Sequence, residues 1–284
     1  MEDCNLKCVS CDSTTLVKDG KHNNMQRYRC KECGKRFDYG EYKGDYKTFT
    51  HFNIKLKVTD RNHISRENYC VPSNELSYSE RKYLKFLIEH TDYEIPNEIY
   101  LDERHYTDEF VQEQFDSCME NYDLNMTFFN QLSNEKFSKH ISSFVRKNCF
   151  KEVTDLKKLD GIIGIYILVL DNYKQIYIGQ STNIKKRILQ HWTRKKEFDR
   201  LLCGDVDESI ISIDSFGALD TTRIFYKSCS WSDLDKNENK YLIQISPDFC
   251  LNRVSGGING EIDKDVRDVS LWATRKKRNL KFSV

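Results

Sequence analysis

The chain is poor in the residues that break regular structure. Its 284 residues include only 3 prolines and 12 glycines, which favours helices and strands over a low-complexity chain. Hydrophobic residues make up 38% of the sequence, and tyrosine and phenylalanine are plentiful. The length fits one large domain or two to three small ones.

Long apolar runs are also missing. The longest, Ile162–Leu170, has the length of a strand rather than of a membrane-spanning helix. The amino-terminal sequence MEDCNLKC is acidic and polar, whereas a secretory signal has basic residues followed by an apolar segment. We therefore expect a soluble, cytoplasmic protein with no membrane partner.

Neither sign of charge is in excess. Lysine and arginine number 45, aspartate and glutamate 44, and the net charge is +1. The charges are unevenly placed, because residues 75–125 are acidic whereas residues 174–200 and 275–278 are basic. The neutral total therefore conceals basic segments of the kind that contact phosphate.

Eleven cysteines are an odd number for a disulfide framework, and no export signal accompanies them. Four of them form two pairs, Cys8-x2-Cys11 and Cys30-x2-Cys33, with 18 residues between the pairs. Each pair can present two thiolates from one turn, and two pairs complete a tetrahedral zinc shell. Gly34 suits the backbone bend that such a turn needs. The segment has little apolar sequence, so zinc would supply its folding energy.

Residues 7–37 are similar to the zinc ribbon that opens IS1-type transposase proteins. The similarity rests on the two cysteine pairs and on the basic sequence from Gln26 to Phe37, and it implies a DNA-binding β-ribbon. Basic residues interleaved with aromatic ones also suit phosphate contact without any resemblance. The predicted DNA-binding residues here are Lys18, Arg27, Arg29, Lys35 and Arg36. The alternative is a purely structural or protein-binding ribbon.

Residues 41–155 show helical periodicity and charged sequence. Helices are predicted around Leu84–Ile88, Asp108–Tyr122 and Asn134–Lys147. Ser77 or Ser79 is the expected N-cap of the first helix. A small helical bundle or linker is the simpler interpretation, and a helix-turn-helix across residues 126–146 is the alternative.

A β-hairpin with two tyrosines is predicted next. Ile162–Leu170 is β-branched and short, residues 171–174 form a polar turn, and Gln175–Gly179 returns as a second strand. Tyr166 and Tyr177 can thus lie on neighbouring strands.

A helix is predicted to start near Ile184, after N-cap candidates at residues 181–183. Arg187 and His191 lie four residues apart on it, hence on one face. A guanidinium beside an imidazole can bind phosphate next to a titratable group. Taken alone, such a pair is usually a solvated helix face.

A second helix is predicted from Trp231 to about Ile245, ended by Pro247. Glu238 projects from it and could hold a divalent cation. Taken alone, a glutamate on a helix is usually a solvated charge.

Gly164-Ile165-Tyr166 and Tyr177-Ile178-Gly179, followed by this arginine–histidine helix, resemble the GIY-YIG nuclease family over residues 161–257. The resemblance implies a small three-stranded antiparallel sheet flanked by helices. It also implies hydrolysis of a phosphodiester bond with Mg²⁺ or Mn²⁺ held by Glu238. Repair-type members carry lysine where this chain has Gln180. The residues that the resemblance assigns to catalysis are Tyr166, Tyr177, Arg187, His191, Glu238 and Asn252.

The whole chain is thus predicted to be an α+β protein with four parts. These are a zinc ribbon (1–40), a helical block (41–155), a GIY-YIG domain (156–260) and a basic tail (261–284). Further DNA contacts are predicted at Lys185, Lys186, Arg194 and Lys195.

The predicted function is metal-dependent cleavage of DNA, with double-stranded DNA as partner and targeting by the ribbon. A homodimer or sequential nicking would be needed to cut both strands. A mobile-element, homing, phage or restriction and defence role is expected, at the nucleoid of a bacterial or phage-infected cell. The alternatives are an RNA substrate, or a zinc-ribbon regulator whose nuclease-like domain is idle.

Overall fold

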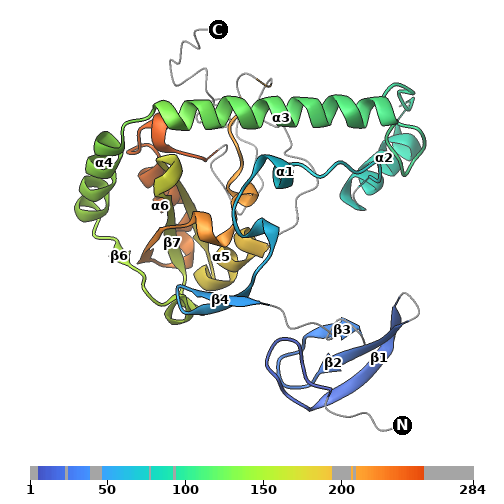
Figure 1. The fold of residues 1–284 in the computed structure, drawn as a ribbon, viewed down its shortest axis with the longest axis horizontal. Helices are drawn as coiled ribbons and strands as arrows, with labels where there is room; N and C mark the ends of the chain where they lie inside the picture. The colour runs from blue at the N-terminus through green and yellow to red at the C-terminus, as the bar shows by residue number, and fades with distance from the viewer. Residues whose placement is uncertain are drawn as a thin grey trace. The chain divides into compact units, whose positions relative to one another are not determined.

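The structure is a computed structural model that describes residues 6–22, 25–38, 47–76, 78–91, 94–193, 206 and 209–252 (Figure 1). The chain divides into two compact units, Met1–Thr48 and Phe49–Val284. No described helix is both long and apolar enough to cross a bilayer.

The first unit is a three-stranded antiparallel sheet in the order β1-β2-β3. Its strands are β1 (Leu16–His22), β2 (Met25–Cys30) and β3 (Arg36–Asp38). Its buried core consists of Cys8, Cys30 and Phe37. A core of three side chains is too small to hold a domain by burial alone, so the unit needs a metal or a comparable cross-link.

The second unit is built on a four-stranded antiparallel sheet in the order β6-β9-β7-β8. Its strands are β6 (Lys151–Glu152), β9 (Arg223–Ser228), β7 (Gly164–Leu170) and β8 (Gln175–Ser181). The three-stranded sheet implied by the sequence is thus extended by a fourth strand. β6 has only two residues, both exposed, so no hydrophobic alternation marked it in the sequence.

The central strand β7 is buried on both faces. Tyr166, Leu168 and Leu170 belong to one core cluster, and Ile165, Ile167 and Val169 belong to the other. This explains why the sequence of the strand is continuously apolar rather than alternating.

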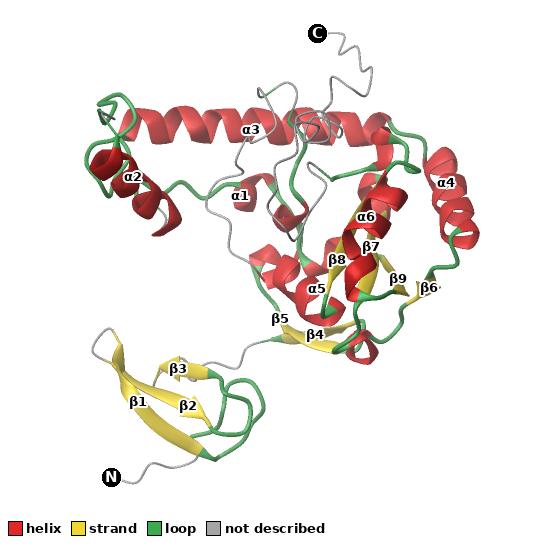
Figure 2. Cartoon of the chain, turned by 180° about the vertical axis from the view of Figure 1, so that it is seen from behind, coloured by secondary structure: helices red, strands yellow, loops and turns green. Residues whose placement is uncertain are grey.

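Helices cover each face of the sheet (Figure 2). On the face of Tyr166 lies α5 (Ile184–Thr193), and α3 (Asp108–Gln131) runs across one end of the sheet; buried residues of both helices join the first cluster. On the opposite face lie α6 (Leu234–Leu242) and α4 (Asn134–Lys147), which contribute to the second cluster. The unit therefore has three layers, with the sheet in the middle.

Short 3₁₀ turns connect the longer elements. They are Asp60–Asn62, Leu156–Leu159, Asp171–Tyr173, Ile213–Ser215, Ala218–Asp220, Trp231–Asp233 and Pro247–Phe249.

Helix α3 is longer than predicted, because it continues past Tyr122 to Gln131. Two buried asparagines interrupt its apolar pattern. Asn125 Nδ2 donates to the carbonyl and Oδ1 of Asn121, at 2.7 and 2.9 Å, and to the carbonyl of Ser209, at 3.1 Å. The polar side chains are thus satisfied inside the core.

Helix α2 (Tyr78–His90) forms where a helix was predicted and lies beside one end of α3 (Figures 1 and 2). Ser79 is the second residue of the helix, so its predicted N-cap role is wrong. Ser77 lies outside the described residues. The helix-turn-helix alternative falls on the end of α3 and on α4, and both bury aromatic side chains in the core of the second unit.

A hairpin, β4 (Thr48–His51) and β5 (Ile54–Lys57), was not predicted. Phe52 and Asn53 at its tip have φ angles of 45° and 61°, as a type I′ turn requires. The hairpin packs into the second unit, since the Phe52 carbonyl accepts from Leu156 N at 3.0 Å. The proposed boundary between residues 155 and 156 stays a prediction.

Asp220 ties the segment after this hairpin to the sheet. Its fully buried carboxylate accepts from Ile64 N at 2.8 Å, Gly217 N at 2.7 Å and the Tyr173 hydroxyl at 3.0 Å. His63 Nδ1 lies 3.1 Å from it. Four partners, three of them distant from Asp220 in the sequence, hold one buried acid.

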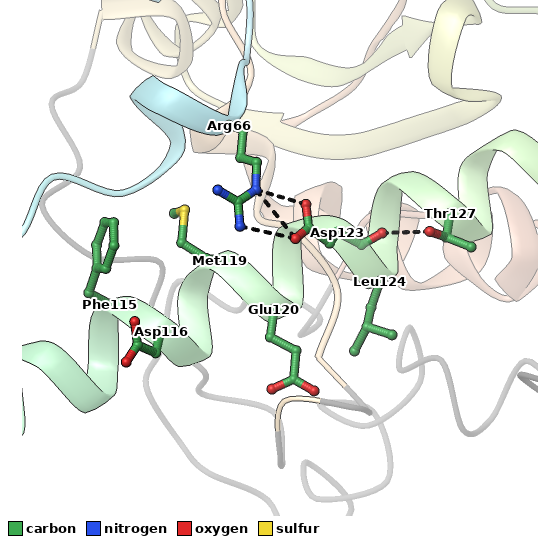
Figure 3. Close-up of a pocket in the computed structure, with 8 residues that line it drawn as sticks. All are labelled: Arg66, Phe115, Asp116, Met119, Glu120, Asp123, Leu124 and Thr127. Atoms are coloured by element: carbon green, nitrogen blue, oxygen red, sulfur yellow. Dashed lines mark hydrogen bonds and ion pairs between the residues drawn. The ribbon is translucent and has the colours of Figure 1, made fainter. Parts of the chain in front are cut away.

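Short helix α1 (Arg66–Tyr69) is attached to α3 by an ion pair. Arg66 contacts the Asp123 carboxylate through Nε at 3.1 Å and Nη2 at 3.2 Å (Figure 3). The pair borders an open cavity of about 480 Å³. This cavity is lined by Arg66, Phe115, Asp116, Met119, Glu120, Asp123, Leu124 and Thr127, and by none of the predicted catalytic residues.

Candidate active site and metal centre

The four paired cysteines converge in the first unit. The sulfur atoms of Cys8, Cys11, Cys30 and Cys33 all lie within 4.8 Å of one another. Cys8 and Cys33 Sγ are 3.4 Å apart, and Cys11 and Cys30 Sγ are 3.6 Å apart. A tetrahedron with Zn–S bonds of about 2.3 Å has edges of about 3.8 Å. The cluster therefore fits a structural zinc ion, as the sequence predicted.

Two similar turns present these sulfurs. Asp12 and Gly34, each following the second cysteine of a pair, have φ angles of 58° and 73°. Their amides donate to the carbonyls of Cys8 and Cys30, both at 3.0 Å. The backbone amides of Cys33 and then Glu32 lower the pKa of the Cys30 thiol to about 6, which favours the thiolate form that binds metal. The backbone amide of Ser13 lowers the pKa of the Cys11 thiol, but burial and the other three thiols together raise it by more, so the cluster shares its protons when no metal is bound.

The predicted DNA-binding residues of the ribbon differ in their surroundings. Arg27 Nε contacts Asp38 Oδ1 at 3.2 Å, and Arg36 Nε contacts Asp19 Oδ2 at 2.6 Å. Sequence spacing gave no sign of these ion pairs. Lys18, Arg29 and Lys35, the other three, form no ion pair with any residue that the structure describes.

In the second unit, the two tyrosines lie on adjacent strands, as predicted. Tyr166 of β7 lies opposite Gly179 of β8, and Leu168 lies opposite Tyr177. The tyrosine ring centroids are 6.2 Å apart. Both side chains are on the sheet face that α5 covers, so they form one aromatic surface under that helix.

Helix α5 places an arginine and a histidine over this surface. Asn183 is its N-cap, since Asn183 Oδ1 accepts from Lys186 N at 3.0 Å. His191 is 2% exposed, and its Nε2 lies 2.8 Å from the Tyr166 hydroxyl. Its ring centroid is 5.2 Å from that of Tyr177. His191 is therefore part of the buried site and not of a solvated helix face, whereas Arg187 is half-buried beside it.

The acidic partner of His191 was not predicted. Asp214 Oδ1 contacts His191 Nδ1. Asp214 lies in the 3₁₀ turn Ile213–Ser215. No periodicity marks so short a turn, and 22 residues separate Asp214 from His191 in the sequence.

Glu238 reaches the site from α6 and is 3% exposed. Gln180 Nε2 donates to Glu238 Oε2 at 2.9 Å and to Asp235 Oδ1 at 2.5 Å. Burial, with a further contribution from Asp235, raises the pKa of Glu238 to about 8. The Gln180 hydrogen bond and the charge of Arg187 do not offset the effect of burial on the Glu238 carboxylate. A buried carboxylate of this kind is a suitable oxygen ligand for a divalent cation.

The charges of these groups act on one another. Burial raises the pKa of both Tyr166 and Tyr177 well above its ordinary value, the charge of Glu238 adds to the effect, and Arg187 opposes it. Burial also disfavours the charge of Arg187, but both tyrosines raise the pKa of the guanidinium above its usual value. Two phenols, an arginine and a buried acid therefore share one electrostatic site.

Asn252 lies beside the second tyrosine motif rather than in the aromatic surface. Its Oδ1 accepts from Ile178 N at 3.0 Å, and its Nδ2 donates to the Ile178 carbonyl at 2.7 Å. Both ends of the amide thus continue the hydrogen-bond ladder at the outer edge of β8. These contacts place Asn252 as a support for the strand that carries Tyr177.

The sequence of this unit matches a known family. The chain carries a GIY-YIG catalytic domain at residues 162–243. The match confirms the family expected for this part of the chain and indicates a nuclease, a hydrolase that acts on DNA. The chain matches no curated protein and no solved structure. The resemblance of the ribbon to IS1-type proteins stays a prediction.

The matched residues include Tyr166, Tyr177, Arg187, His191 and Glu238. Asn252 and the hairpin β4–β5 lie outside the matched range. GIY-YIG nucleases generally depend on a divalent metal, and within the GIY-YIG domain Glu238 has the burial and chemistry for such an ion.

The basic residues predicted to contact DNA from the GIY-YIG domain divide into three groups. Lys185 Nζ contacts Asp160 Oδ2 at 2.7 Å, so it is engaged within the protein. Lys186 is exposed. Arg194 and Lys195 lie outside the described residues.

Proposed function

We propose that this protein is a metal-dependent DNA endonuclease in which the GIY-YIG domain cleaves the phosphodiester bond and the zinc ribbon binds DNA. The observation that supports the proposal is the aromatic surface of Tyr166 and Tyr177, with His191 Nε2 2.8 Å from the Tyr166 hydroxyl, inside the matched GIY-YIG domain. The charges of Arg187 and Glu238 act on both tyrosines, as expected of groups that share one phosphate site.

Arg187 and Tyr177 would bind the scissile phosphate. The guanidinium would neutralise the charge that develops on the non-bridging oxygens. Tyr177 keeps its proton, because burial raises its pKa, so its hydroxyl can donate a hydrogen bond to the phosphate.

Glu238 would hold Mg²⁺ or Mn²⁺. Such an ion, when bound, polarises the phosphate and stabilises the leaving oxygen. The pKa of Glu238 is raised to about 8 by burial, so a cation would replace a proton there. Metal affinity is therefore expected to increase as the pH rises toward 8.

Tyr166 would orient the attacking water and take its proton. A phenol is a poor base at neutral pH, and burial makes ionisation of Tyr166 still less favourable. Neutral His191, whose Nε2 is 2.8 Å from the hydroxyl, can receive the phenol proton as the water proton is taken up. Asn252 would act indirectly, by holding β8 at Ile178.

The ribbon would supply much of the DNA affinity, through Lys18, Arg29 and Lys35. Replacing all three with alanine is expected to weaken duplex binding and to reduce the slope of log affinity against log salt by about three. The matched control replaces three exposed lysines of the other unit, Lys82, Lys85 and Lys139. Equal losses in the two triple variants would show that the ribbon has no special role.

A single active site cuts one strand, so double-strand breaks would need a homodimer or two sequential nicks. The ribbon with a nuclease suits a mobile-element, phage, homing or restriction and defence enzyme, acting on the nucleoid of a bacterial or phage-infected cell. Mapping the cut ends on a random-sequence duplex would establish the target.

Cleavage of supercoiled plasmid tests the proposal. The wild-type protein is expected to produce nicked or linear DNA with Mg²⁺ and none with a chelator in excess. Glu238→Ala should be at least about 10²-fold slower, whereas Glu152→Ala, on exposed β6, should match the wild type. Tight plasmid binding without metal-dependent cutting would favour a DNA-binding regulator with an idle nuclease-like domain.

A further inference from the structure

Three side chains form a continuous hydrogen-bonded chain from the sheet to the turn Ile213–Ser215. Tyr166 contacts His191 Nε2, and His191 Nδ1 contacts Asp214. We propose that Asp214 is a positioning residue, which holds His191 in the orientation and tautomer that accept the proton of Tyr166. The inference rests on the proposed nuclease function and adds a residue that neither motif of the sequence indicated.

Hydrogen-bond chemistry assigns the protons. An ionised carboxylate can only accept, so His191 Nδ1 must carry the hydrogen that faces Asp214. In a neutral imidazole Nε2 is then the acceptor, and the Tyr166 hydroxyl must donate to it. Without Asp214, the other tautomer could place a hydrogen on Nε2, which would then donate to the Tyr166 oxygen and could not accept the phenol proton.

Packing fixes the imidazole in this place. Its side chain is 1% exposed, whereas that of Asp214 is 15% exposed. The rings of Tyr177 and Tyr166 lie at interplanar angles of 69° and 52° to it, with centroids 5.2 and 6.0 Å away. The aromatic neighbours hold the ring in place, so its contact with the Asp214 carboxylate decides which nitrogen carries the proton.

Two protons move in the proposed step. As Tyr166 takes a proton from the attacking water, its own phenol proton passes to His191 Nε2. His191 becomes an imidazolium, which stays paired with the Asp214 carboxylate, and no electrons are transferred to or from the protein. The deprotonated water oxygen forms the new bond to phosphorus, and the leaving oxygen departs.

A cavity of about 570 Å³ lies on the Asp214 side of the pair. His191 and Asp214 form part of its wall, and the segment of β5 and the turn after it forms another part. This opening gives the imidazolium a route to return its proton to solvent through the Asp214 side. The hairpin outside the matched GIY-YIG domain thus completes the surroundings of a residue within it.

Other titratable and charged groups also surround His191. Among the residues that the structure describes, they are Tyr166 on β7, Tyr177 on β8, Arg187 on its own helix, His51 on β4 next to Trp192, and Lys55, Lys57, Asp60 and Arg61 around the cavity. Asp214 carries a carboxylate in contact with the ring. Removing its charge should therefore lower the pKa of His191.

Single-turnover cleavage by Asp214→Asn tests this role. The rate at saturating DNA and pH 7 should fall about 10²-fold or more, with DNA affinity within about twofold of wild type. The acidic limb of the pH–rate profile should move to lower pH, because the reaction needs neutral His191. Asp116→Asn, a variant of an exposed aspartate of α3, should leave both rate and profile unchanged.

A spectroscopic measurement tests the tautomer without any cleavage. In ¹⁵N-histidine-labelled protein at neutral pH, the His191 signals, assigned by their loss in His191→Gln, should show a protonated Nδ1 and an unprotonated Nε2. Asp214→Asn should change this pattern while circular dichroism stays that of the wild type.

The outcomes separate the two proposals. A wild-type protein that cuts no DNA would refute the nuclease function. A cutting wild type matched by Asp214→Asn in rate and pH profile would refute the role of Asp214 alone. A wild-type His191 protonated on Nε2 would refute the role even if Asp214→Asn lost activity or failed to fold.

Discussion

Gly179 lies directly across from Tyr166 on the neighbouring strand, and the phenol ring covers the space that a side chain at position 179 would fill. A β-carbon on Gly179 would sit 2.4 Å from Tyr166 Oη and 2.8 Å from Tyr177 Cε1. The last glycine of the second motif is therefore required by the tyrosine of the first. The two short motifs therefore form one packed unit across β7 and β8.

Gly179→Ala should displace the Tyr166 ring. We expect a loss of about 1–3 kcal/mol in the free energy of unfolding from overpacking, and a fall in cleavage rate of about 10²-fold because a catalytic group moves. Gly161→Ala is the control, since no atom lies within 4 Å of its β-carbon although φ is +71°. Gly161→Ala should lose about 1–2 kcal/mol and keep its cleavage rate. Full activity in Gly179→Ala would contradict the packing argument.

Glu238 should make stability depend on pH. Its folded-state pKa of about 8 lies above the ordinary value of 4.5, so between these values the folded state binds more protons than the unfolded state. Without divalent metal, stability should therefore fall as the pH rises from about 4.5 to 8. Glu238→Gln should flatten this part of the curve and be more stable than wild type by roughly 1–3 kcal/mol at pH 8.5.

Urea unfolding at several pH values measures this effect. Glu152→Gln, on exposed β6, should reproduce the wild-type curve. Added Mg²⁺ should stabilise the wild type at pH 8.5 and leave Glu238→Gln unchanged. A Glu238→Gln curve parallel to that of wild type would show that Glu238 is not the buried acid described here.

Zinc should stabilise the folded ribbon and have no effect on the stability of the second unit. Purified protein is expected to contain one zinc ion per chain, and Cys33→Ser should lose it. Because the chain divides into two compact units, the variant should lose the unfolding transition of the first unit and keep that of the second. Cys149→Ser, at an exposed cysteine outside the cluster, should retain both the zinc and the two transitions. Metal analysis and calorimetry decide between these results.

Replacing Asp220 should destabilise the second unit more than replacing the exposed Asp123. Asp220→Ala leaves three donors and a histidine without their buried partner, and we expect a loss of about 3–5 kcal/mol. Asp123→Ala removes an ion pair that is 54% exposed on both sides and should cost less than about 1 kcal/mol. Urea denaturation of the two variants tests the difference, and equal losses would contradict the assignment.

Features with a strong local pattern were predictable from the sequence. The apolar run of β7 identified a buried strand, the cysteine spacing identified the metal cluster, and residues 181–183 included the N-cap of α5. Each depends on residues close together in the chain, where spacing alone fixes geometry.

Features that depend on distant contacts were not predictable. The role of Asp214 follows from its contact with His191, which is distant in the sequence. The two buried asparagines of α3, Asn121 and Asn125, have the sequence character of surface residues, and only their tertiary contacts show that they are buried. The tip of the unpredicted hairpin is Phe52-Asn53, without the glycine that usually marks a type I′ turn. Tertiary contacts override the local signal at each of these places.

The most direct test of the account is the single-turnover rate of duplex cleavage with Mg²⁺, at saturating DNA, by Arg187→Ala and by Lys186→Ala. Both variants remove one positive charge from adjacent positions of α5, but only Arg187 faces the two tyrosines and Glu238. We predict that Arg187→Ala loses at least about 10³-fold in rate and that Lys186→Ala stays within about threefold of wild type. Cleavage by Arg187→Ala at the wild-type rate would contradict the proposed active site.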